Sequence, residues 1–238
     1  MKPVAIFRYS ATEGPGHFAT FLSEHGLPWT LVRLDENEPV PASCDEFSGL
    51  GFLGGPMSAN DEFHWTQPVL DLMRRAVDEK VPVIGHCLGG QMLARALGGT
   101  VTRNPVKEIG WVSVRSEDND VAREWLGPHL KRFTTFQWHE DTFSLPPGAT
   151  RILTGDHCPN QAYVVDDRHL GMQCHVEVTS EIVETWCRIG ITDIDQNVGL
   201  SPAVQDALTI RTLIPERLPE NTATASKLYR RWIRNLRD

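Results

Sequence analysis

The pattern of apolar positions near the start of the chain predicts a strand, a helix and a second strand. Residues 4–7 form a short apolar run, and residues 18–25 show helical spacing and are followed by Gly26. Residues 29–34 form the second strand-like run. A strand, a helix and a strand in this order indicate a βαβ unit with parallel strands.

The same alternation continues to residue 99. Apolar runs at 50–53 and 81–84 predict two further strands, and residues 67–79 between them predict a helix. A glycine-rich turn at 85–90 leads into a helical segment at 91–97. Alternating strands and helices predict a three-layer α/β fold with a central, mostly parallel, twisted sheet.

Beyond residue 100 the pattern becomes rich in strands. Thr179 or Ser180 then offers the side-chain oxygen that caps a helix, and this helix is expected to extend to residue 189. The predicted strands cover residues 111–115, 131–136, 151–154, 161–165 and 170–173.

The tail from Pro202 contains two helical patterns, which Pro215 and Pro219 separate. Positive charges near a helix C-terminus oppose the helix dipole, so a solvated docking helix accounts for the basic residues of the second pattern. A partner-binding face is the alternative. We find no repeat or flexible linker, and we expect a single domain over 1–238 with 191–238 as a C-terminal helical extension. The basic residues are Lys227, Arg230, Arg231, Arg234 and Arg237.

Composition and charge narrow the classes of partner. The chain has 238 residues, of which 40% are hydrophobic, and a formal net charge of −8. Nucleic-acid binding depends on clustered Lys and Arg, so this acidic balance favours a small molecule or another protein. No apolar stretch approaches the roughly 18 residues of a membrane span, and the run at 4–7 is too short for a signal peptide. The five cysteines lack disulfide spacing, and we expect a soluble, cytoplasmic protein with free thiols.

The most informative unit is the turn around Cys87. Gly85 and Gly89 lie two residues before and two after this cysteine, between a predicted strand and a predicted helix. This is the pattern of a nucleophile elbow, in which only small neighbours avoid the displaced chain of a strained central residue. At a helix N-terminus the dipole favours thiolate over thiol. The alternative is a glycine-rich turn that contains an ordinary buried cysteine.

Cofactor and metal motifs are weak by comparison. Gly14 and Gly16 lack the third glycine of a dinucleotide-binding loop, and no Gly-Lys-Ser/Thr follows a strand. The metal-ligand types at 157–158 and 174–175 lack the spacing of a zinc site. We therefore expect neither a cofactor nor a metal.

His175 and Glu177 are suited to serve a thiolate. A nucleophilic cysteine needs a base, and the base needs a third group that orients it. Two residues apart in an extended segment, these side chains project to the same side, so the carboxylate can reach one imidazole nitrogen. They follow a predicted strand, at the end where α/β sheets place their sites. Alone, a His-x-Glu pair is weak evidence.

Residues 85–91, Gly-His-Cys-Leu-Gly-Gly-Gln, resemble the Gly-x-Cys-x-Gly-x-Gln signature of class I glutamine amidotransferases. Residues 173–177 are similar to the family's Gln-aromatic-His-Pro-Glu motif, and residues 53–56 to its Gly-Gly-Pro turn. The stretches 98–111, 138–143 and 158–162 look most like a stand-alone branch similar to the amidotransferase domain of GMP synthase. The resemblance covers about residues 1–190 and implies the family's flavodoxin-like fold.

The resemblance also implies roles for individual residues. Cys87 would attack the carboxamide carbon of glutamine, and His175, oriented by Glu177, would protonate the departing ammonia and later activate water against the thioester. The backbone amides of Gly55 and Leu88 would bind the oxyanion. The residues implied in substrate binding are Gln91, His139 and Glu140; for Gln91, a structural role at the turn or facing solvent is the alternative.

Two departures from the family pattern bear on the substrate. Val176 stands in place of the usual Pro, and Cys174 in place of the usual aromatic residue. A β-branched Val suits extended backbone, so we expect the geometry to persist and the shape of the pocket to differ.

Three functions remain open. The first is an amidotransferase that hydrolyses glutamine and passes ammonia to a separate synthase subunit, because the chain carries no ATP motif of its own. The second is a stand-alone γ-glutamyl peptidase or hydrolase that uses the same triad. The third is a non-catalytic regulatory module on the same fold. Assembly as a homodimer is left open by the sequence.

Overall fold

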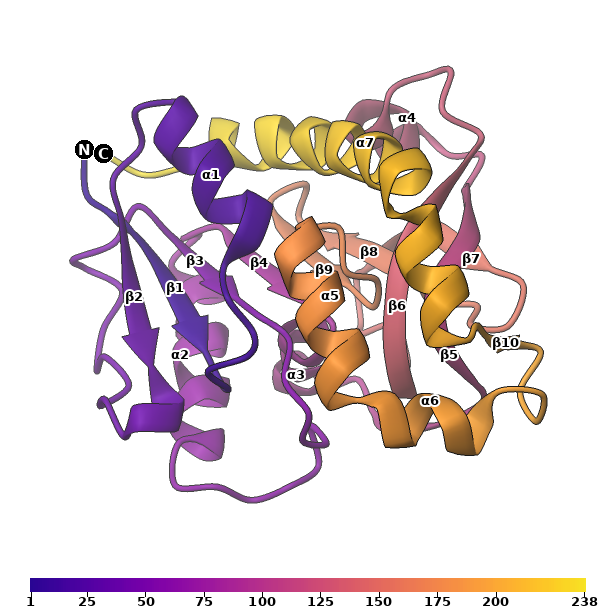
Figure 1. Ribbon diagram of the computed structural model, residues 1–238. Helices are drawn as coiled ribbons and strands as arrows, with labels where there is room; N and C mark the ends of the chain where they lie inside the picture. Colours follow the sequence, from indigo (N-terminus) through magenta and orange to yellow (C-terminus); the bar gives the residue numbers. More distant parts are fainter.

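A ten-stranded sheet forms the centre of the computed structural model, which describes residues 1–238 (Figure 1). The strands lie in the order β10-β5-β7-β8-β9-β4-β3-β1-β2, and β6 pairs with the other side of β5. Their bounds are β1 Val4–Arg8, β2 Trp29–Arg33, β3 Gly49–Phe52, β4 Val83–His86, β5 Val101–Ser116, β6 Arg132–Phe143, β7 Thr150–Gly155, β8 Ala162–Val165, β9 His169–Met172 and β10 Ala203–Val204.

The sheet has a parallel half and a largely antiparallel half. From β2 through β1, β3 and β4 to β9, every neighbouring pair is parallel. From β9 through β8 and β7 to β5 and β6, every pair is antiparallel, and the short β10 adds a parallel edge to β5. Strand β9 is therefore the border between the halves.

Helices cover both faces of the sheet. They are α1 Gly16–Glu24, α2 Thr66–Asp78, α3 Leu88–Ala96, α4 Asp120–Leu126, α5 Ser180–Ile189, α6 Ile191–Asn197 and α7 Ala207–Trp232, with 3₁₀ turns η1 Leu34–Glu36 and η2 Ile233–Asn235. None of these helices combines the length and the hydropathy needed to cross a bilayer.

Alternation along β1 shows how the layers form. Ala5 and Phe7 pack into a core with side chains of α2 and α3, whereas Val4 and Ile6 pack into a second core with side chains of α1, α4 and α7. Successive side chains of a strand point to opposite faces, so one central strand contributes to both cores. The predicted three-layer α/β fold is confirmed.

The predicted elements agree with the structure in kind and differ in extent. The helix after the glycine-rich turn begins at Leu88, three residues before the predicted start, so it follows Cys87 directly. Strands β5 and β6 have 16 and 12 residues and form a long hairpin, of which only parts were predicted. Helix α4 was not predicted, and α6 lies within 191–238, which was predicted only as a helical extension without individual bounds. Thr179 caps α5 as predicted, accepting a hydrogen bond from the backbone N–H of Ile182.

The prediction of two helices in the tail is wrong. A single helix, α7, continues through Pro215 and Pro219, and Figure 1 shows that it bends along its course. Each proline removes one backbone hydrogen bond and bends a helix without necessarily ending it. Buried contacts on both sides of the prolines hold the two parts in place: Ile210 packs in one core cluster and Trp232 in another.

Candidate active site

Cys87 lies at the carboxyl end of β4 and is the residue before α3. Its backbone has φ 47° and ψ −107°, a region that costs a non-glycine residue conformational energy. A Cβ atom on Gly85 would lie 2.4 Å from the carbonyl carbon of Gly89, and one on Gly89 would lie 2.4 Å from the oxygen of Phe52. The two glycines thus allow the close approach on which the elbow depends, and the sulfur stands at the start of a helix.

His175 and Glu177 lie just beyond β9, the border strand of the sheet. Nδ1 of His175 and Oε1 of Glu177 are 2.7 Å apart, and both side chains are buried. The backbone N–H of His175 donates to the carbonyl of Phe136 in β6 at 2.8 Å, and the ring of Trp186 packs edge-on against the imidazole. Strand β9, the hairpin of β5 and β6, and helix α5 therefore all help to hold His175 and Glu177 in place.

The electrostatics of the pair favour an imidazolium and a carboxylate. Burial acts to lower the pKa of His175, but the charges of Glu177 and Cys87 and hydrogen bonds to both outweigh it, so the pKa of His175 lies well above its usual range. Burial acts to raise the pKa of Glu177, but His175 outweighs it and the pKa is lowered. With Nδ1 occupied by Glu177, Nε2 is left to face Cys87.

The two residues implied as oxyanion donors, Gly55 and Leu88, lie close together. A Cβ atom added to Gly55 would lie 2.8 Å from Cδ2 of Leu88. Leu88 is the first residue of α3, where a backbone N–H has no acceptor within the helix. Gly55 lies with Cys87 in the wall of the same cavity.

Gln91 is buried in the cavity wall and neither faces solvent nor caps the turn. Its amide nitrogen donates to the carbonyl of Asp141 and to Oε1 of Gln173, each at 3.2 Å. Gln173 in turn donates to the sulfur of Cys87 at 3.6 Å. The glutamine therefore belongs to a network that reaches the nucleophile.

His139 and Glu140 differ in their availability to a ligand. Both ring nitrogens of His139 are engaged: Nδ1 with the carbonyl of Asp141 at 2.9 Å, and Nε2 with Oε2 of Glu108 at 2.8 Å. Glu140 forms an ion pair with Arg103 near the surface. His139 thus shapes the wall through protein contacts, and the sequence reasoning missed Glu108, its buried partner.

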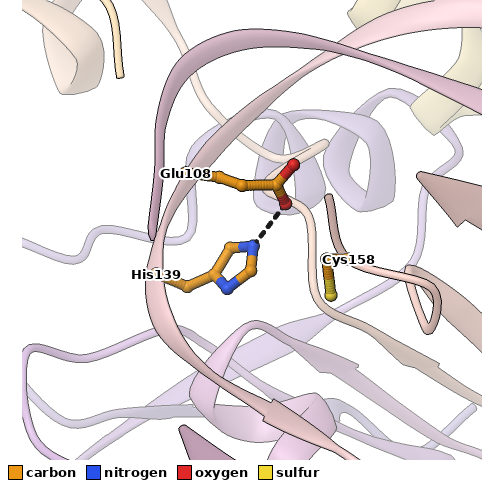
Figure 2. A group of neighbouring side chains, drawn as sticks. All are labelled: Glu108, His139 and Cys158. Atoms are coloured by element: carbon orange, nitrogen blue, oxygen red, sulfur yellow. Dashed lines mark hydrogen bonds and ion pairs between the residues drawn. The ribbon is translucent and has the colours of Figure 1, made fainter. Parts of the chain in front are cut away.

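Figure 2 shows Cys158 beside Glu108 and His139. One potential metal-ligand atom from each lies within 4.8 Å of the others, a grouping from three separate segments that linear spacing could not reveal. Burial raises the pKa of Cys158 to about 12, which keeps this thiol protonated. His139 and Glu108 bond to one another, and Gln161 donates to the same carboxylate oxygen at 2.9 Å. Their contacts are those of a buried hydrogen-bonded network.

A cavity of about 700 Å³ opens in front of Cys87. Residues that the sequence reasoning did not single out line it, including Glu13, Trp186 and the ion pair of Lys107 with Asp193. They come from a loop, from β5 and from α5 and α6, at positions that neither a catalytic motif nor periodicity marks as a site. Only the fold brings them to the nucleophile.

Comparisons with known proteins give a family model and a similar solved structure. The family model described as "Glutamine amidotransferase class-I" matches residues 18–185. A solved structure described as a glutamine amidotransferase from Methylobacillus flagellatus superposes with a TM-score of 0.96 at 45% identity, covering 100% of this chain and 96% of that one.

Two curated relatives are also similar. One subunit of the glutamine-hydrolysing GMP synthase of Sulfolobus acidocaldarius is 35% identical over 56% of this chain and 69% of its own length. Gamma-glutamyl peptidase 3 of Arabidopsis thaliana is 26% identical over 71% of each chain.

Proposed function

Because the chain belongs to the class I glutamine amidotransferase family, we propose that it hydrolyses the γ-carboxamide of glutamine through a thioester on Cys87. The observation that carries this proposal is the arrangement of Cys87 at a helix start beside His175, whose other nitrogen is held by Glu177 at 2.7 Å. A nucleophile, a base and an orienting carboxylate in this order are what acyl transfer requires.

In the proposed reaction, the thiolate of Cys87 adds to the carboxamide carbon. The amides of Gly55 and Leu88 bind the resulting oxyanion. The carbon–nitrogen bond then breaks, and the proton on Nε2 of His175 goes to the departing ammonia. His175 next takes a proton from water, whose oxygen attacks the thioester; glutamate leaves and the sulfur is released. Glu177 stabilises the imidazolium at both stages.

The test is release of ammonia and glutamate from glutamine by the wild-type protein and by Cys87→Ala. Cys44→Ala is the matched control, because Cys44 is also a buried free thiol but does not line the cavity. We expect turnover in the wild type and the control and none in Cys87→Ala. Turnover that survives in Cys87→Ala would contradict the proposed nucleophile.

A second candidate is a stand-alone γ-glutamyl peptidase or hydrolase. The cavity volume of about 700 Å³ favours it, because glutamine loses only ammonia and needs little room on the leaving side. The similarity to a gamma-glutamyl peptidase supports the same hypothesis. Cys87-dependent cleavage of γ-glutamyl peptides without turnover of glutamine would select this candidate.

The ammonia acceptor belongs to the first candidate alone. The similarity to one subunit of a GMP synthase supports transfer of ammonia to a separate synthase. In that case glutamine turnover should rise when the synthase is added. If no γ-glutamyl substrate is cleaved with or without a synthase, the third hypothesis holds, a non-catalytic module on the same fold.

A further inference from the structure

Building on the proposed hydrolysis at Cys87, we propose that the cavity contains a subsite for a positively charged leaving group, in which Glu13 binds an ammonium group of the departing amine. The substrate class is then the γ-glutamyl amides of diamines: one amine nitrogen forms the amide that breaks, and the other carries the charge.

Glu13 stands on the side of the cavity from which the amine departs. His175 gives its proton to the leaving nitrogen, so this nitrogen must lie beside the imidazole. A Cβ atom on Gly54 would lie 2.8 Å from Cε1 of His175 and 3.2 Å from Oε2 of Glu13, so both atoms pack against the same face of Gly54. The glutamyl portion is assigned to Gln91, which lines the same cavity.

The carboxylate of Glu13 lacks a Lys or Arg partner. Burial raises the pKa of Glu13 to about 7, the charge of Glu177 adds to this, and His175 opposes it. An ammonium group entering the cavity would supply the missing positive charge. The other acidic side chains of the cavity wall already have partners: Asp193 with Lys107, Glu140 with Arg103, and Asp141 with the hydroxyl of Ser58 at 2.7 Å.

Apolar side chains form part of the cavity wall, and one of them, Trp186, contacts the imidazole of His175. Trp186 and Ile189 of α5 line the cavity, and Nε1 of Trp186 donates to the carbonyl of Thr12 at 2.9 Å, which fixes the loop that carries Glu13. An alkyl chain can pack on these apolar side chains while its terminal ammonium meets the carboxylate. Apolar side chains with one carboxylate beside them complement an alkyl diamine.

The chemistry is that of the proposed function with a different leaving group. The sulfur of Cys87 bonds to the γ-carbonyl carbon, the carbon–nitrogen bond breaks, and the proton of His175 goes to the departing nitrogen. The free diamine leaves, and water then hydrolyses the thioester to glutamate and restores the sulfur.

Four probes separate charge from size. They are γ-glutamyl-1,4-diaminobutane, the uncharged isostere γ-glutamylpentylamide, the anionic γ-glutamylglycine, and glutamine. A hydrogen bond to a charged group corresponds to roughly tenfold or more in kcat/KM, so we expect this advantage of the diamine probe over the pentylamide in the wild type. In Glu13→Gln the ratio of kcat/KM for the diamine probe to kcat/KM for the pentylamide should fall to near one, while glutamine turnover is kept. Glu13→Asp should retain part of this ratio.

Asp193→Asn is the matched control, because it removes one carboxylate from the same cavity. The preference for the diamine probe over the pentylamide should persist in this control. An equal fall of this preference in the control and in Glu13→Gln would overturn the assignment to Glu13. Equal rates on the charged and uncharged probes in the wild type would overturn the subsite. A uniform loss on all four probes in a folded Glu13→Gln would do so too, because it would place Glu13 at the glutamyl portion. Absence of turnover on every probe in the wild type would contradict the proposed function itself, and the inference with it.

Discussion

Asn221, in the middle of α7, donates its side-chain amide to the backbone carbonyls of His175 and Val176, each at 3.3 Å. The asparagine is fully buried, so bulk solvent does not reach this contact. The C-terminal helix thereby holds the segment that carries the base of the candidate site.

Replacement of Asn221 by Ala should therefore lower both stability and turnover. Leaving two buried carbonyls without a donor costs on the order of 1–3 kcal/mol of unfolding free energy. The kcat should fall more than KM rises, because His175 loses its support while the substrate pocket stays. Chemical denaturation and steady-state kinetics measure the two effects. Asn235→Ala, which removes a bond to the carbonyl of Asp167 at the surface, should change neither.

Gly55→Ala should reduce turnover with little loss of stability. The new methyl group would lie 2.6 Å from Sδ of Met57 and 2.8 Å from Cδ2 of Leu88, both ends of flexible side chains that can shift. The methyl group would also lie 3.2 Å from Cβ of Tyr9, which cannot swing away, so the backbone of Gly55 must move and displace one amide of the proposed oxyanion site. Loss of one such donor costs on the order of 100-fold in kcat. Gly14→Ala is the control, since a methyl there meets no atom within 4 Å. An unchanged kcat in Gly55→Ala would exclude this amide from the oxyanion site.

Glu108 and His139 should prove energetically coupled. Each is the buried hydrogen-bond partner of the other at 2.8 Å. Glu108→Gln, His139→Asn and the double variant form a cycle whose interaction energy we expect to be about 1–3 kcal/mol in unfolding free energy. Because Asp141 connects His139 to Gln91, the single variants should also raise KM for glutamine. Strict additivity would show that the two side chains act independently.

The His175–Glu177 pair should increase the unfolding free energy over a limited range of pH. The pKa of Glu177 is lowered from its usual 4.5, so its contribution is present above that value and is lost as the pH falls through the lowered pKa. The pKa of His175 is raised from 6.5, so its contribution is complete below that value and is lost as the pH rises through the raised pKa. The difference in unfolding free energy between wild type and Glu177→Gln should thus be largest between these two usual values. Denaturant titrations from acid to alkaline pH test this; a difference that is flat with pH would contradict it.

Binding of a diamine derivative should depend on the charge of Glu13. Its carboxyl has a pKa of about 7 in the free protein, with Glu177 and His175 as the charged groups that face it. The KM for γ-glutamyl-1,4-diaminobutane should fall as the pH rises through this value, because the anionic form binds the ammonium group. The slope should vanish in Glu13→Gln. The uncharged pentylamide serves as the reference for other titrations in the cavity.

The elbow and the His-x-Glu pair could be predicted because each consists of residues close together in sequence. Gly85, Cys87 and Gly89 specify a turn by their own backbone requirements, and alternation in extended chain places His175 and Glu177 on one side. The α/β class followed in the same way from alternating runs over the first half of the chain.

Glu13, Glu108 and Asn221 could not be found in this way. Each is an ordinary polar residue that belongs to no catalytic motif, and its role depends on partners that the fold brings from distant segments. Asn221 contacts residues 45 and 46 positions away, and Glu108 meets His139 at a separation of 31. The continuity of α7 through two prolines was missed for the same reason, because tertiary packing outweighs local preference.

Because the site lies at the border of the two half-sheets, we expect turnover to require that both halves are folded. Cys87 follows a strand of the parallel half, whereas His175 is held by Phe136 of the antiparallel hairpin. A refolding intermediate with only the parallel half formed would have Cys87 in place but no positioned His175. An intermediate with only the antiparallel half formed would have the hairpin that holds His175 but no positioned Cys87. Recovered turnover therefore reports that both halves have docked, and it should lag behind recovery of helical circular dichroism.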